Sequence, residues 1–175
     1  TEPGKGYYVV LESYENGELI KTEKTEKRTL DNGKNTFSIP FNPSYAIQNV
    51  KVYVVAEDGT IICEPIEDTI KTLKHLFIGN SFSNNARKRL WEIANSAGFD
   101  IIKIGNIYKG GCSLQTHSEY AADNTAGYTY YKIEDGSTRS YADSTMLRGI
   151  LDEDWMTISF QQASTDSGKP ETINT

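Results

Sequence analysis

The sequence has little of several residue types on which common functions depend. It contains two histidines and two cysteines in 175 residues, and Cys63 and Cys112 lack the paired spacing of a zinc site or a redox motif. It also lacks an excess of positive charge, because 24 acidic residues against 18 basic ones leave a formal net charge of -6. Nucleic-acid binding needs a basic surface to meet the phosphate backbone, so we expect no nucleic-acid partner.

Long apolar runs are missing as well. No segment approaches the roughly 20 consecutive apolar residues of a membrane-spanning helix, so no membrane span is expected. A hydrophobic fraction of 37% is still enough for the core of a globular protein. The first residues, Thr1 to Gly4, are neither a start methionine nor a signal peptide. We expect an extracellular or periplasmic protein whose signal peptide has been removed.

Short apolar segments separated by turn residues fill the first 70 positions. Three Asn-Gly or Asp-Gly pairs stand at positions 16–17, 32–33 and 58–59, and such pairs supply the positive φ angles of tight hairpins. The expected strands are Tyr7 to Leu11, Thr36 to Phe41, Val50 to Ala56 and Ile61 to Pro65. We therefore predict that residues 1–70 form a small antiparallel β-sandwich-like domain.

The pattern changes after Pro65, and residues 71–175 are predicted to form an α/β domain with a parallel sheet. The expected elements are a strand at His75 to Gly79, a helix at Asn84 to Ala97 ending before Gly98, a strand at Ile101 to Ile104, a short helix at Ser144 to Leu151 and a strand at Met156 to Phe160. This alternation favours parallel strands with right-handed crossovers. The tyrosine-rich stretch from Ser113 to Tyr141 is predicted to be a long loop with a turn at Asp135-Gly136.

A polar segment follows each of the three expected parallel strands. Ser81 follows the first, Gly110 to Ser113 the second, and Gln161 to Ser164 the third. Because the carboxyl ends of parallel strands meet at one edge of a sheet, a serine, a glycine NH and amide donors would converge there. That set is typical of a nucleophile with an oxyanion hole. The turn around Ser81 taken alone indicates, more ordinarily, helix capping or anion binding.

These segments resemble, in order, the sequence blocks of the SGNH/GDSL hydrolase superfamily, and specifically its bacterial subfamily known as domain of unknown function 4886. The run GNSFS matches the first block, with Ser81 at the nucleophile position. The run GGCSLQTH corresponds to the second block, whose glycine, here Gly111, donates an oxyanion-hole NH. The run DEDWMTISFQQAS matches the third, where Gln162, or else Gln161, stands at the place of an oxyanion-hole asparagine. The resemblance extends from about residue 73 to 168.

The resemblance implies a serine esterase or acetylesterase that acts on carbohydrate or other acyl esters without metal or organic cofactor. It implies a flavodoxin-like three-layer α/β/α fold, with Asn80, Tyr108 and His117 as further substrate contacts. The Asp-x-x-His block that supplies the catalytic base is absent, and neither His75 nor His117 stands at its place. We therefore expect the chain to hold only the amino-terminal part of the hydrolase domain and to be inactive by itself.

Two other classes of function stay open at this stage. One is a non-catalytic glycan-binding or cell-surface interaction protein with a degenerate hydrolase domain. The other is a phosphate- or nucleotide-binding domain, although the turn lacks the Walker lysine and the spaced glycines of dinucleotide sites. The tyrosines between Ser113 and Tyr141 fit either a substrate wall that stacks on sugars or packing over the sheet edge.

Overall fold

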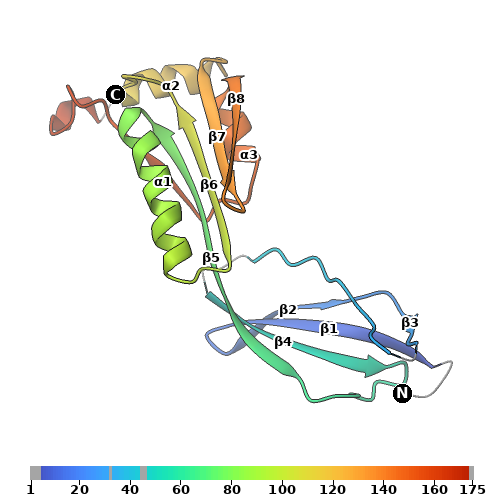
Figure 1. Cartoon of the computed structure of the whole chain (residues 1–175). Coiled ribbons are helices and arrows are strands. Elements are labelled where there is room, and N and C mark those ends of the chain that lie inside the picture. The colour runs from blue at the N-terminus through green and yellow to red at the C-terminus, as the bar shows by residue number, and fades with distance from the viewer. Residues whose placement is uncertain (1–4, 32, 44–46, 174–175) are drawn as a thin grey trace. The chain divides into compact units, whose positions relative to one another are not determined.

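The computed structural model of the chain describes residues 5–31, 33–43 and 47–173. The chain divides into two compact units, Thr1–Lys71 and Thr72–Thr175. One strand, β5 (Ile66–Gly79), contributes its first residues to the first unit and the rest to the second (Figure 1). The structure is a mixed α/β fold with nine described strands and three α-helices, α1 to α3.

The first unit is built around β1 (Gly6–Glu15). This strand pairs in antiparallel fashion with β2 (Glu18–Lys24), β3 (Arg28–Thr29) and β4 (Ile47–Ala56), and β4 pairs with the start of β5. Asn16 and Gly17 have positive φ angles of 50° and 84°, so the predicted β1–β2 hairpin is confirmed. The antiparallel pairing is also confirmed, and the described strands of this unit lie in one sheet rather than in two facing sheets.

Two predicted strands of the first unit are wrong. The segment Thr36 to Phe41 has no strand partner, and Pro40 within it has no backbone NH to give to a ladder. The segment Ile61 to Pro65 contributes only an isolated bridge between Ile61 and Val55, beyond a turn in which Gly59 has a φ of 89°. The second expected turn, at positions 32–33, includes Asn32, which lies outside the described residues.

The second unit contains the predicted parallel strands. The later part of β5 pairs in parallel with β6 (Ile101–Tyr108) on one side and with β9 (Thr157–Phe160) on the other. The parallel arrangement expected for these three strands is therefore confirmed. Their carboxyl ends lie at one edge, since Gly79 is opposite Tyr108 and Ile78 is opposite Phe160.

The tyrosine-rich segment is not a loop, so that prediction is wrong. It forms α2 (Leu114–Ala122) and an antiparallel hairpin of β7 (Tyr128–Glu134) and β8 (Ser137–Ser144) that extends the sheet beside β6. Tyr128 and Tyr130 are buried in the core of this unit, as the alternation of a strand requires. The predicted turn is confirmed, because Asp135 and Gly136 have φ angles of 49° and 72°.

The two longer crossovers place helices on opposite faces of the sheet. From α1 (Ser81–Ser96), the Ser83 hydroxyl lies 3.0 Å from Oδ1 of Asn106 on β6. From α3 (Met146–Leu151), Gly149 packs against the side chain of Ile107. Asn106 and Ile107 are successive strand residues and therefore point to opposite faces. A short 3-10 helix, η1 (Pro170–Thr172), follows β9.

Helix α1 is the longest helix of the structure, with 16 residues. As predicted, a glycine in the left-handed conformation follows it, since Gly98 has a φ of 70°. Within the described ranges, no helix combines the length and apolar character needed to cross a membrane.

Candidate functional site

The turn between β5 and α1 consists of a single residue, Asn80, which caps the helix. Its Oδ1 accepts a hydrogen bond from the NH of Phe82 at 3.3 Å, and the side chain is 3% exposed. Ser81 is the first residue of α1 and is exposed. Its hydroxyl makes no hydrogen bond within the described part of the chain. Capping is therefore the role of Asn80, and the Ser81 hydroxyl stands free at the positive end of the helix.

Ser83 links α1 to the sheet below it. Its buried hydroxyl donates to the carbonyl oxygen of Asn80 at 2.7 Å and lies 3.0 Å from Oδ1 of Asn106. Asn106 Nδ2 is buried and has no partner as placed. Since the single hydroxyl hydrogen of Ser83 goes to Asn80, the contact is satisfied when the Asn106 amide is turned to direct its NH2 toward Ser83.

Gln161 follows β9 directly and lies against the beginning of α1. Its Oε1 accepts hydrogen bonds from the NH groups of Ser83, at 3.0 Å, and Asn80, at 3.4 Å. Gly79 is necessary for this approach, because a Cβ there would lie 2.8 Å from that Oε1 and 2.9 Å from the Ser83 hydroxyl. The amide nitrogen of Gln161 has no hydrogen-bond partner among the described residues.

The neighbouring Gln162 is fully occupied by structural hydrogen bonds. Its Oε1 accepts from the NH groups of Leu114, at 2.8 Å, and Ala163, at 2.9 Å. Its Nε2 donates to the hydroxyl and carbonyl oxygens of Thr172 at 3.1 and 3.3 Å. Gln162 thus joins the end of β9 to the start of α2 and to η1. Of the two glutamines, Gln161 is the one whose amide NH2 is available to a ligand.

The segment after β6 is held beside Asn80. The NH of Lys109 donates to the carbonyl oxygen of Gly79 at 2.9 Å. Asn80 Nδ2 donates to the carbonyl oxygens of Cys112, at 3.4 Å, and Gln162, at 3.2 Å. Gly111 is exposed and has a φ of 65°, a conformation that favours glycine. The amide of Asn80 therefore ties together the three segments that follow the parallel strands.

The three residues expected to contact substrate lie in different environments. Asn80 is buried and engaged in the contacts just described. Tyr108, at the end of β6, is partly buried, with its ring centroid 6.1 Å from that of Tyr131. His117 lies in α2 rather than in a loop and is 1% exposed, so the prediction of a loop there is wrong.

His117 is enclosed by aromatic side chains. Its Nδ1 is 3.0 Å from the hydroxyl of Tyr128, and the two rings stack with their centroids 5.7 Å apart. Burial, together with the positive charge of Lys109, lowers the pKa of His117 from 6.5 to about 4. The ring is therefore neutral at neutral pH, with a buried Nε2 that has no partner in the described structure.

The side chain of His75 is also held by contacts within the fold. It lies within β5, and its Nδ1 and Nε2 are 2.6 and 2.9 Å from the hydroxyls of Thr157 and Ser159 on β9. Burial lowers its pKa from the ordinary value. Neither histidine makes a hydrogen bond with Ser81 in the described structure.

A mostly apolar hollow of about 230 Å³ lies along α1 and the neighbouring strands. It is lined by Phe77, Ile78, Phe82, Ser83, Ala86, Ser159 and Gln161. Over the described ranges, no group of three or more His, Cys, Asp or Glu side chains is arranged to hold a metal ion.

Sequence reasoning offered capping as the ordinary role of this turn and named Asn80 as a substrate contact, but it missed the bridging role of Asn80. The preference of asparagine for the N-cap position was the available signal for capping. Nothing in the sequence distinguished the two adjacent glutamines, because the hydrogen bonds of Gln161 to α1 and of Gln162 to η1 are set by the tertiary structure.

Comparison with known proteins identifies a family that matches residues 74–175 of this chain. Residues 74–175, more than half of the chain, match the family described as Domain of unknown function (DUF4886). A crystal structure of a DUF4886 family protein from Bacteroides uniformis is similar, with 38% sequence identity and a TM-score of 0.56. The similarity covers 58% of this chain and 40% of that chain, and no curated protein matches. This chain therefore belongs to the DUF4886 family.

Proposed function

We propose that the second unit carries the nucleophile of an SGNH-type serine esterase that acts on carbohydrate or other acyl esters in an exported protein. The observation that supports this most is the division of roles between Asn80 and Ser81. Asn80 caps α1, so the Ser81 hydroxyl is exposed and unbonded at the helix amino terminus, directly after a buried strand. A nucleophile needs that exposure and the positive end of the helix dipole.

In the proposed reaction, Ser81 Oγ attacks the ester carbonyl and loses its proton to a general base. The alcohol leaves with a proton, an acyl group stays on Ser81, and water then releases the acid. The oxyanion would be stabilised by the NH groups of Ser81 and Gly111 and by the free NH2 of Gln161. Gln162 is not assigned this role, because its NH2 is held by Thr172.

The general base is assigned to a segment outside these 175 residues. His117 is buried and bonded to Tyr128, and His75 is bonded to two hydroxyls of β9. Either ring would have to leave these contacts to reach the Ser81 hydroxyl. The B. uniformis protein, of which this chain covers 40%, has ample further sequence.

The apolar hollow beside α1 is lined by Phe82 and Gln161 but not by Ser81, and we assign it to a small apolar acyl group of the ester. Phe77, Phe82 and Ala86 give it a lining that suits methyl or methylene groups, and Gln161 lies at the same hollow. No metal or organic cofactor is required for this chemistry.

Hydrolysis of nitrophenyl acetate by the natural full-length protein tests the proposal. We expect Ser81→Ala to lower kcat/KM by about 10,000-fold or to background, because the nucleophile is lost. Ser118→Ala, which removes an exposed hydroxyl on α2, should leave the rate unchanged. The 175-residue chain alone should be close to background.

Two results would contradict the proposal. Strong activity of the 175-residue chain that His117→Ala abolishes would show that the base is His117. An inactive full-length protein, tried on a range of acetyl and longer acyl esters, would remove the esterase assignment.

A further inference from the structure

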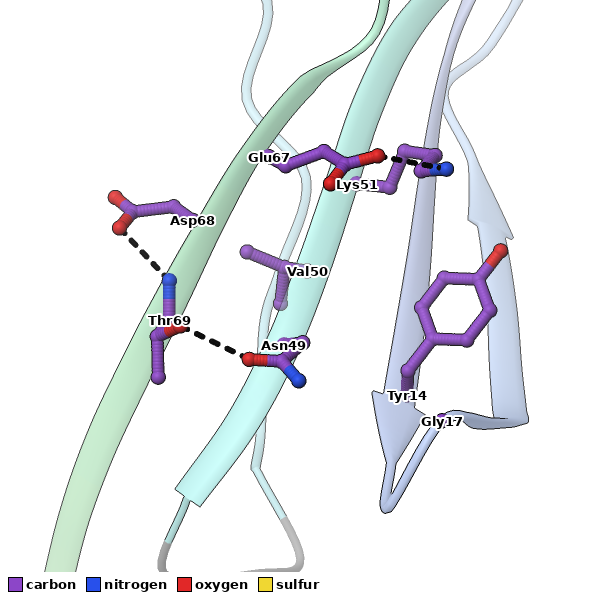
Figure 2. Close-up of a pocket in the computed structure, with 8 residues that line it drawn as sticks. All are labelled: Tyr14, Gly17, Asn49, Val50, Lys51, Glu67, Asp68 and Thr69. Carbon is purple, nitrogen blue, oxygen red and sulfur yellow. Dashed lines mark hydrogen bonds and ion pairs between the residues drawn. The ribbon is translucent and has the colours of Figure 1, made fainter.

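The first unit carries a groove of about 440 Å³ on its antiparallel sheet (Figure 2). Eight residues line it, from β1, the following turn, β4 and β5: Tyr14, Gly17, Asn49, Val50, Lys51, Glu67, Asp68 and Thr69. All of them belong to the first unit. The volume lies within the range of about 300–1,000 Å³ that is usual for small-molecule sites.

The strand register places complementary groups in a row on one face. Tyr14 is opposite Asn49, and Asn49 is opposite Thr69, so an aromatic ring, an amide and a hydroxyl are direct neighbours across three strands. The pairing of β1 with β2 is irregular between Ser13 and Tyr14. Such irregularities redirect a side chain, and they are frequent beside binding sites.

The Tyr14 ring is fixed before any ligand arrives. Its hydroxyl donates to Oε2 of Glu12 at 2.6 Å, and the other oxygen of Glu12 accepts from the hydroxyl of Tyr53 at 2.7 Å. These two hydrogen bonds lower the pKa of Glu12, so the carboxylate stays ionised and keeps hold of both rings. The ammonium nitrogen of Lys51 lies over this ring, 5.9 Å from its centroid, and a ring that is already fixed loses little entropy when a ligand packs against it.

Polar groups beside this ring are free to bind hydroxyls. Asn49 is exposed and uses only its Oδ1, which accepts from Thr69 at 2.9 Å. Asp68 precedes Thr69 on β5, so its side chain points to the opposite face of the sheet and is not one of these groups. Within the described structure, the Asn49 NH2 therefore offers donors between Tyr14 and Thr69, as Figure 2 shows.

The charge of the groove disfavours an anionic ligand. Lys51, the one basic residue among the lining residues, is paired with Glu67 at 2.8 Å. A negatively charged ligand would find no free lysine among the lining residues, because Glu67 already holds Lys51. A ligand with many hydroxyls, apolar CH faces and no charge fits the groove better.

We propose that this groove binds a neutral saccharide, with Tyr14 stacking on a sugar ring and Asn49 hydrogen-bonding to its hydroxyls. The inference goes beyond the proposed esterase function and does not depend on Ser81. It assigns a binding role to the first unit of the chain.

The test is calorimetric titration of the whole chain with cellohexaose, xylohexaose and mannohexaose, with trigalacturonate as the anionic comparison. At least one neutral probe should bind, and Tyr14→Ala and Asn49→Ala should each weaken that binding about tenfold. Tyr8→Ala is the matched control, since it removes a tyrosine of the same strand that does not line the groove. Ser81→Ala should bind as the unmodified chain does, which separates this result from the outcome for the esterase.

Thermal melting followed by circular dichroism shows whether each variant is folded. If Tyr14→Ala does not fold, Asn49→Ala decides, because its side chain is exposed and its loss leaves the strands paired. The proposal is wrong if no neutral probe binds at millimolar concentration. It is equally wrong if trigalacturonate binds as tightly as the neutral probes, or if folded Tyr14 and Asn49 variants keep full affinity.

Discussion

At the scale of single residues, the exposure of the Ser81 hydroxyl depends on Asn80, which occupies the N-cap position of α1. Asn80 supplies the capping oxygen to Phe82 and uses its NH2 to hold the segments after β6 and β9. A serine in the capping position would have its hydroxyl engaged. Because the asparagine comes one residue earlier, the serine is left exposed.

The second residue of interest at this scale is His117, whose protonation should couple to folding. Its pKa is about 4 in the folded chain and 6.5 as an ordinary value, so between these values the unfolded chain binds more protons. Stability from this group is therefore fully present above pH 6.5 and is lost as the pH falls toward 4. The difference of about 2.5 pKa units corresponds to about 3 kcal/mol.

Urea unfolding between pH 4 and 7 measures this contribution. We expect His117→Gln, which keeps a hydrogen-bonding group beside Tyr128, to have a shallower loss of stability over that range than the unmodified chain. The comparison removes the effect of the acidic residues, which titrate in both proteins. Identical pH profiles would show that His117 is not buried in neutral form.

At the scale of elements, the second crossover differs most from the sequence-based prediction. The spacing of Tyr128 and Tyr130 is that of a strand with one buried face, although a loop is predicted there from the sequence. Its partner β8 is largely polar and exposed, so its pairing with β7 is visible only in the structure. The first two parallel strands were predictable because their apolar patterns are strong, whereas α1 buries Ser83, Arg87 and Ala94 and leaves Ile93 exposed.

Helix α3 provides a test of packing against helix propensity. Gly149 is buried, and a Cβ at that position would overlap the side chain of Ile107, which is itself 0% exposed. Helix propensity alone predicts that Gly149→Ala stabilises the chain by about 1 kcal/mol. We expect destabilisation by about 1–3 kcal/mol instead, because the core is close-packed.

A double-mutant cycle measured by urea unfolding separates the two effects. Ile107→Val removes the methyl group that the new Cβ would meet, so it should recover part of the cost of Gly149→Ala. A stabilised Gly149→Ala variant, or strictly additive effects of the two substitutions, would contradict the close contact of α3 with β6.

At the scale of the whole molecule, the two units differ in how far sequence could describe them. In the second unit, the three parallel strands and the segments that meet at their carboxyl edge followed from the sequence, because parallel strands impose that geometry, whereas α2, β7 and β8 did not. The choice between Gln161 and Gln162 did not, because it depends on tertiary hydrogen bonds to Ser83 and Thr172. In the first unit the groove residues are individually ordinary, and only the register of β1, β4 and β5 brings Tyr14, Asn49 and Thr69 into one row.

The central claim is that Ser81 is the nucleophile, and covalent labelling tests it most directly. The natural full-length protein is treated with a fluorophosphonate, which reacts with activated serines, and the modified peptide is identified by mass spectrometry. The account predicts one modified site, Ser81, and no labelling of Ser81→Ala, because the hydroxyl is exposed at the helix terminus while the neighbouring Ser83 is buried. A folded full-length protein whose Ser81 remains unlabelled, or in which another serine carries the label, would contradict it.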